Sequence, residues 1–143
     1  MQKISELKEG DEFDFGTTTL SKKEIIAFGK QFDPLPFHVD KQAAEQSHFK
    51  GLIASGPHLF TKIHRDCWIP VFGLTVLAGL EINNWQFLQP IYAEMPIHSK
   101  AVIKSIKKNP GKQHAVITWQ YLFTNKQQEK VQKVEATVLH SLN

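Results

Sequence analysis

The feature that most constrains the fold of this chain is the alternation of apolar and polar residues through its second half. Apolar side chains recur at every second position from Leu74 onward, which is the period of a β-strand with one buried face. The alternation predicts four strands, over residues 74–87, 97–106, 114–124 and 130–140. Short polar turns link the last three strands, so we expect consecutive antiparallel strands in one sheet.

The first of these strands is longer than the usual strand and has an irregular middle. Val76, Ala78, Leu80 and Ile82 fall on one face, which the alternation predicts to be buried. Two consecutive asparagines at residues 83–84 interrupt the apolar pattern, and asparagine is depleted in strands. We therefore expect the strand to bend at this point.

A helix is predicted to begin after Ser21, because Ser21 and Glu24 have the spacing of a capping box. Apolar residues follow at helical intervals as far as Phe32. The helix should end at Asp33, because the following proline disfavours helical geometry in the residue before it. A second proline repeats this constraint two positions later, so residues 33–38 are expected to be extended and stiff.

A short helix over residues 41–45 is predicted to be capped by Asp40, and a more important helix follows. Residues 55–57, with the sequence Ser-Gly-Pro, supply a cap and a favourable first-turn proline for it. Its apolar stripe consists of Leu59, Phe60, Ile63 and Cys67. This stripe predicts a well-buried helix that ends near Pro70.

Helices followed by four consecutive strands predict an α+β fold, with an antiparallel sheet packed on one helix. The length of 143 residues is that of one domain, expected to span residues 1–143. One sheet on one helix leaves strand edges uncovered, so we expect a homodimer.

The composition points to an ordinary globular protein and excludes several classes. A single cysteine rules out an internal disulfide, and no signal peptide or membrane-length apolar run is present, so we expect a cytoplasmic protein. The net charge of +3 comes with no nucleic-acid-binding motif, so we expect no nucleic-acid partner. His58 and His64 on the buried helix have no metal-ligand partner at i+4, and we expect no metal and no cofactor.

Asp33 and His38 are the residues that first suggest chemistry. They place one carboxylate and one imidazole five positions apart on a proline-stiffened segment, and such a pair can perform general acid/base work. Each also has an ordinary structural interpretation. An aspartate before proline commonly ends a helix, and a histidine beside apolar residues commonly belongs to the core or a loop.

Ser55 and Gly56 stand at the start of the buried helix, and they are the second candidate pair. Backbone N–H groups at a helix N-terminus lack intrahelical partners and lie at the positive end of the helix dipole. They therefore suit a carbonyl oxygen that gains negative charge during a reaction. The structural interpretation of Gly56 is helix capping, and the two interpretations are compatible.

Two separated segments resemble the MaoC-like dehydratase family, which includes (R)-specific enoyl-CoA hydratases. The first segment, residues 33–40, reads Asp-Pro-Leu-Pro-Phe-His-Val-Asp, and the second, residues 49–56, reads Phe-Lys-Gly-Leu-Ile-Ala-Ser-Gly. The resemblance implies a hot-dog fold, in which a sheet curls around one long helix, and a homodimer. Leu35 departs from the family pattern, because many catalytic members carry asparagine there.

The resemblance also implies a reaction: water is added to a trans-2-enoyl thioester or removed from an (R)-3-hydroxyacyl thioester. Asp33 would orient and deprotonate the attacking water, and His38 would hold that water and help to move its proton. The Gly56 N–H would bind the thioester oxygen, with Ser55 beside it, and the substrate would be a thioester of coenzyme A or acyl carrier protein. A non-catalytic protein that binds acyl thioesters and a thioesterase are the alternatives on this fold.

Overall fold

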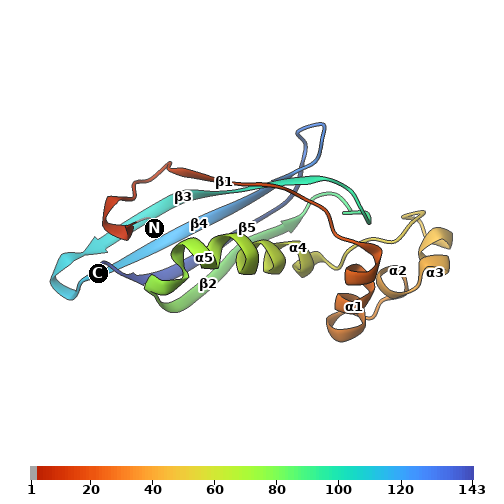
Figure 1. Ribbon diagram of the computed structural model, residues 1–143, viewed down its shortest axis with the longest axis horizontal. Coiled ribbons are helices and arrows are strands. Elements are labelled where there is room, and N and C mark those ends of the chain that lie inside the picture. Colours follow the sequence, from red (N-terminus) through yellow and green to blue (C-terminus); the bar gives the residue numbers. More distant parts are fainter. Residues whose placement is uncertain (1–2) are drawn as a thin grey trace.

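The computed structural model describes residues 3–143 and contains a five-stranded antiparallel sheet (Figure 1). The strands are β1 (Glu12–Thr18), β2 (Val76–Phe87), β3 (Ile97–Asn109), β4 (His114–Thr124) and β5 (Lys130–Ser141). Their order across the sheet is β1-β3-β4-β5-β2, which places β1 and β2 at the two edges. The four predicted strands are confirmed, and β1 is a fifth strand that the four-strand prediction omitted.

The helix that packs on the sheet is longer than predicted. It begins as α4 (Gly56–Ile63), continues through a π-helical segment (His64–Trp68) and ends as α5 (Ile69–Phe72). The helix passes through Pro70 and ends two residues beyond it, whereas the prediction placed the end near the proline itself. Within the π-helical segment the Ile69 N–H already bonds to the His64 carbonyl, five residues back, and this wider turn accommodates the missing N–H of the proline.

Aromatic side chains join this helix to the face of the sheet. The rings of Phe60 and Tyr121 meet edge to face at 4.8 Å, and those of Trp68 and Trp119 do so at 5.4 Å. Trp68, Trp119 and Tyr121 are completely or almost completely buried, and aromatic pairs in these geometries add to the stabilisation from burial. A sheet wrapped around one buried helix is the α+β hot-dog fold that the family resemblance implied.

The edge strand β2 differs from its prediction. Leu80 and Ile82 were expected on the buried face, but they are 53% and 51% exposed. The ladder between β2 and β5 shifts register three times, and each irregularity changes which side chains face the helix. The bend near the two asparagines is confirmed: Asn84 has a φ of 50° and lies inside the last register shift.

Three helices gather at one end of the molecule, beyond the start of α4 (Figure 1). They are α1 (Lys22–Phe32), α2 (Pro36–Val39) and α3 (Lys41–Gln46). As predicted, Ser21 accepts a hydrogen bond from the Glu24 N–H at 3.1 Å at the start of α1, and Asp40 caps α3. The prediction of an extended segment over residues 33–38 is wrong from Pro36 onward, because α2 is a helical turn, whereas Leu35 is extended. Pro36 stands in its first turn, where a proline has a suitable φ and loses no hydrogen bond.

Candidate active site

The helical turn α2 brings Asp33 and His38 together. An extended segment would separate residues five positions apart by about 16 Å. Instead, His38 Nε2 lies 3.4 Å from Asp33 Oδ2. Asp33 stands at the C-terminal end of α1, and its carboxylate is about one-third exposed, whereas His38 is buried. The buried imidazole of His38 therefore faces the Asp33 carboxylate, which solvent can reach.

A main-chain carbonyl sets the orientation of the His38 ring. His38 Nδ1 lies 2.7 Å from the carbonyl oxygen of Ile53, and because a carbonyl only accepts, Nδ1 carries the hydrogen. In the neutral imidazole, Nε2 then has the free lone pair, directed at Asp33. Gly29 permits this packing, since a Cβ there would lie 3.0 Å from the His38 Cβ. The sequence interpretation missed both Ile53 and Gly29.

Ser55 makes a different contact from the predicted one. It occupies the N-cap position of α4, but its side chain caps no backbone N–H. Its hydroxyl instead donates a hydrogen bond to Asp33 Oδ2 at 2.7 Å, and the residue is only 1% exposed. Ser55 therefore holds the same carboxylate oxygen that faces His38, and the predicted side-chain cap is wrong.

Gly56 begins α4, and its backbone N–H has no hydrogen-bond partner within residues 3–143. The position admits only glycine without rearrangement, because a Cβ would lie 2.7 Å from Cε1 of Phe87 on β2. The N–H lies at the positive end of the helix dipole and is available for an acceptor oxygen. The sequence predicted a free N–H at this helix start, and its role as a donor to the substrate stays a prediction.

The four predicted residues, Asp33, His38, Ser55 and Gly56, line one cavity of about 590 Å³. Apolar side chains form most of its remaining wall: Phe37, Phe49, Ile53, Trp85, Phe87, Leu88 and Ile91. Leu35, which departs from the family pattern, lies outside this lining, and its side chain is 45% exposed. The cavity combines a carboxylate, an imidazole and a free N–H with an apolar wall.

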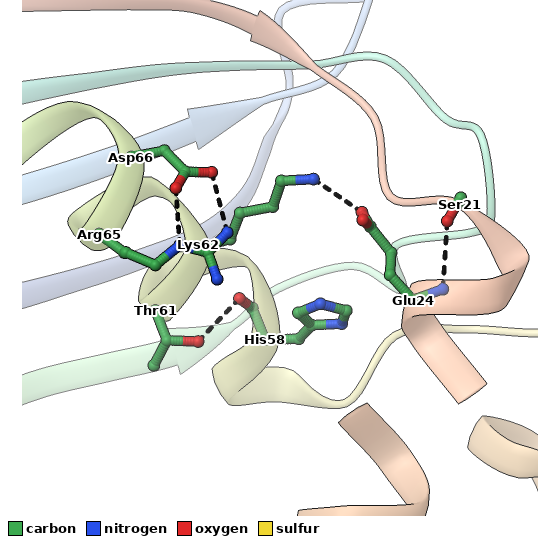
Figure 2. Close-up of polar contacts among 7 residues, drawn as sticks. All are labelled: Ser21, Glu24, His58, Thr61, Lys62, Arg65 and Asp66. Carbon is green, nitrogen blue, oxygen red and sulfur yellow. Dashed lines mark hydrogen bonds and ion pairs between the residues drawn. The ribbon is translucent and has the colours of Figure 1, made fainter. Parts of the chain in front are cut away.

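A second cavity of about 760 Å³ lies between α1 and α4 and shares Asp33 and Ser55 with the first. Figure 2 shows its polar wall, where Lys62 pairs with Glu24 at 2.8 Å and the His58 ring points toward α1. The His58 ring stacks on Phe28, with centroids 4.4 Å apart. Burial lowers the pKa of His58 to about 4, although the charge of Glu24 opposes this shift.

The part of the chain that the structure describes contains no cluster of three or more His, Cys, Asp or Glu side chains suited to a metal ion. Among the same residues, no helix is long and apolar enough to cross a membrane.

His64 is the second histidine of the buried helix. Its Nδ1 forms a hydrogen bond with the Tyr121 hydroxyl at 2.8 Å.

Comparison with known proteins identifies the family. The MaoC like domain matches residues 5–127, and the chain belongs to this family. The protein YdeM of Bacillus subtilis (strain 168) is 31% identical over 140 residues, which cover 96% of this chain and 97% of that protein. The resemblance found in the sequence is thus confirmed.

Solved structures support the same conclusion about the fold. The MaoC-like dehydratase from Rhodospirillum rubrum is 28% identical and superimposes with a TM-score of 0.82, covering 99% of this chain and 97% of that chain. The R-hydratase PhaJ1 from Pseudomonas aeruginosa superimposes with a TM-score of 0.75 at 20% identity, over 97% of this chain and 85% of that one. The second similarity is one of fold.

Proposed function

We propose that this protein adds water to a trans-2-enoyl thioester, or removes it from an (R)-3-hydroxyacyl thioester. The observation that carries the proposal is the arrangement of His38, with Nδ1 fixed by a carbonyl and Nε2 facing Asp33 at 3.4 Å. Membership of the MaoC-like dehydratase family and the similarity to an R-hydratase support water chemistry.

In the hydration direction, a water molecule placed between Asp33 and His38 Nε2 attacks C3 of the enoyl group. The water oxygen forms the new C–O bond, and one of its protons passes to the Asp33–His38 pair. The C2–C3 π electrons move toward the thioester oxygen, and the same pair returns a proton to C2. The pair ends in its starting protonation state, so one water is added in full.

Gly56 supplies the stabilisation of charge in this scheme. Negative charge develops on the thioester oxygen as the enolate-like transition state forms, and the free Gly56 N–H is the donor that would bind it. Ser55 has a supporting role, because its hydroxyl holds the reacting carboxylate of Asp33 in place. All of these steps use protein groups, so the proposal requires no metal or cofactor.

The proposed substrate is an acyl thioester of coenzyme A or acyl carrier protein. The apolar wall of the 590 Å³ cavity provides surface for the aliphatic part of such a molecule. We also propose that residues 1–143 act as one domain in the cytoplasm. The chain has a single cysteine, Cys67, in keeping with a reducing compartment.

The direct test is to incubate the protein with crotonyl-CoA and longer trans-2-enoyl-CoAs and to follow absorbance of the conjugated thioester. We expect the absorbance to fall and the product to have the (R) configuration at C3. Absence of turnover at every chain length and with acyl-carrier-protein substrates would overturn the proposal. Saturable binding without turnover would support the non-catalytic alternative, and release of free thiol would identify a thioesterase.

We further propose that the protein is a homodimer, because β2 ends the sheet and because a band of exposed apolar side chains covers β2 and the residues just before and after it. The band consists of Ile69, Val71 and Leu74 before the strand, Leu77, Leu80, Ile82 and Phe87 on it, and Leu88 after it. An unpaired strand edge beside a large apolar surface favours pairing with a second copy.

Sedimentation equilibrium tests the homodimer. We expect twice the chain mass of 16.3 kDa for the natural protein and a single chain mass for a Leu80→Glu, Ile82→Glu variant. Leu35→Glu is the control, because it places a negative charge on an exposed leucine outside the band. A natural protein that sediments as a monomer would contradict the proposal.

A further inference from the structure

Gln132 is a polar residue buried at the start of an apolar stretch of β5. It is 1% exposed, and the neighbouring Val131 and Val134 are completely buried. A buried amide destabilises a fold unless its polar atoms find partners. The burial of this side chain therefore requires a reason beyond filling space.

The amide of Gln132 reaches the first residue of α4. Its Nε2 donates a hydrogen bond to the Gly56 carbonyl oxygen at 2.9 Å, across 76 positions of sequence. The assignment of the amide is clear, because its oxygen would repel the carbonyl. The bond joins the start of α4 to the sheet at Gly56, a residue that lines the cavity.

The other half of the same amide makes no such contact. Gln132 Oε1 is buried without a hydrogen-bond partner within residues 3–143. An unsatisfied buried acceptor is unfavourable, and an apolar side chain of similar shape would avoid that penalty. Fold stability alone thus gives little reason for glutamine at this position, whereas the bond to Gly56 gives a specific one.

Phe87 restrains Gly56 from the same side. Phe87 lies opposite Gln132 in the ladder between β2 and β5, and its ring leaves no room for a Cβ on Gly56. The two side chains therefore hold Gly56 in two ways, one by contact and one by a hydrogen bond. Both also line the cavity that contains Asp33 and His38.

We propose that Gln132 is a positioning residue that orients the Gly56 N–H toward the thioester oxygen. This inference rests on the proposed role of Gly56 in thioester chemistry. A donor aimed at developing charge loses much of its effect when it is displaced, and misplacements of about 1 Å can lower rates by as much as 100-fold. Loss of the hydrogen bond from Gln132 should displace Gly56 by less than about 1 Å, so we expect a smaller loss of rate.

The first test is Gln132→Met, which keeps the length of the side chain and removes the donor. We expect kcat with crotonyl-CoA to fall about tenfold, with KM changed less than twofold and the thermal unfolding midpoint retained. Gln120→Met on the neighbouring strand β4 is the matched control and should leave kcat unchanged. An unchanged kcat in Gln132→Met would overturn the proposal.

The second test does not depend on turnover and uses protein labelled with ¹⁵N-glycine, since the chain has only eight glycines. Addition of butyryl-CoA, which has no double bond to hydrate, should move the Gly56 amide proton downfield in the natural protein. In Gln132→Met we expect less than half of that shift. A shift of equal size in both proteins, or none in the natural protein, would overturn the proposal, whereas shifts as expected without any turnover would overturn only the hydratase function.

Gln132→Glu provides a third readout and serves where the methionine variant fails to fold. A protonated carboxyl can donate to the Gly56 carbonyl, but a carboxylate cannot. The kcat of Gln132→Glu relative to the natural protein should therefore fall about tenfold as the pH rises and the glutamate ionises. A ratio that stays constant over pH 5.5–9 would contradict a positioning role.

Discussion

Two buried histidines lie in adjoining cavities that share Asp33, and their surroundings differ. His38 has one ring nitrogen bonded to the Ile53 carbonyl and the other directed at the Asp33 carboxylate. His58 has a buried Nδ1 without a partner among residues 3–143 and stacks flat on Phe28. Burial holds His58 in its neutral form, with a pKa of about 4.

The difference shows what burial can and cannot provide. Burial alone removes charge from an imidazole and leaves it as a flat, mostly apolar ring. Proton transfer requires in addition one nitrogen fixed by an acceptor and the other facing a second titratable group. His38 has both features, and His58 has neither, so the comparison assigns chemistry to His38 and packing to His58.

The largest expected effect separates the two histidines directly. His38→Gln should lower kcat for crotonyl-CoA hydration about 1000-fold, because it removes the nitrogen that exchanges a proton with water. His58→Gln is the matched change in the neighbouring cavity and should alter kcat less than about threefold. Steady-state kinetics of both variants provide the measurement, and similar losses of kcat in the two would contradict the assignment of proton transfer to His38 alone.

The next effect concerns the donor beside His38. Gly56→Ala places a methyl group 2.7 Å from the Phe87 ring, so the ring or the start of α4 must shift, and a shift of α4 displaces the N–H. We expect kcat to fall about 100-fold and the free energy of unfolding to fall by about 1–3 kcal/mol.

Gly79→Ala is the control for Gly56→Ala, because a Cβ at Gly79 meets nothing within 4 Å. This variant should have the kinetics and the unfolding midpoint of the natural protein. Equal kcat values for the two alanine variants would show that the position of Gly56 has no bearing on the reaction.

His58 should control stability rather than rate. Its folded pKa of about 4 lies below the ordinary histidine value of 6.5, so between these pH values the unfolded state binds more protons than the folded state. Its contribution to stability is present above about pH 6.5 and is lost as the pH falls toward 4. Each pKa unit corresponds to about 1.4 kcal/mol, which gives a loss of about 2 kcal/mol between pH 7 and pH 5.

Urea unfolding at pH 5 and pH 7 measures this effect. In His58→Phe, the difference in unfolding free energy between the two pH values should be smaller by about 2 kcal/mol than in the natural protein. A difference that remains unchanged would mean that His58 is protonated in the folded protein at pH 5.

The smallest expected effect belongs to Ser55. Ser55→Ala removes the hydroxyl that holds Asp33 Oδ2 and leaves the Asp33–His38 pair in place. We expect kcat to fall about tenfold, because the carboxylate becomes less well oriented. Thr61→Ala, which removes a hydroxyl from the second cavity, is the control and should change kcat less than twofold. A Ser55→Ala variant with the natural kcat would show that Ser55 does not orient Asp33 for the reaction.

The sequence predicted the fold best where consecutive strands are joined by short turns. The strands β3, β4 and β5 carry apolar residues at alternating positions over most of their length and are joined by short turns, so their positions could be derived from the sequence pattern. The burial of β2 could not, because it depends on three register shifts and an edge position, which the pattern does not encode. The helical turn α2 was missed because Pro36 was interpreted as a constraint and not as a helix start.

The candidate site was predictable in its side chains but not in its supporting contacts. Asp33, His38 and Gly56 stand in recognisable segments, and one cavity contains all three. The Ile53 carbonyl could not be found, because main-chain atoms carry no sequence signal. Gln132 had one weak signal, a polar residue in an apolar strand, but its contact with Gly56 depends on the tertiary fold.

The most direct test of the role proposed for the Asp33–His38 pair is crotonyl-CoA hydration by the natural protein, by Asp33→Asn and by Asp40→Asn. Asp33→Asn keeps the shape of the side chain but removes the proton acceptor, whereas Asp40 only caps α3. We expect activity in the natural protein and in Asp40→Asn, and a loss of about 1000-fold or more in Asp33→Asn. Full activity in Asp33→Asn would contradict the assignment of the reaction to the Asp33–His38 pair.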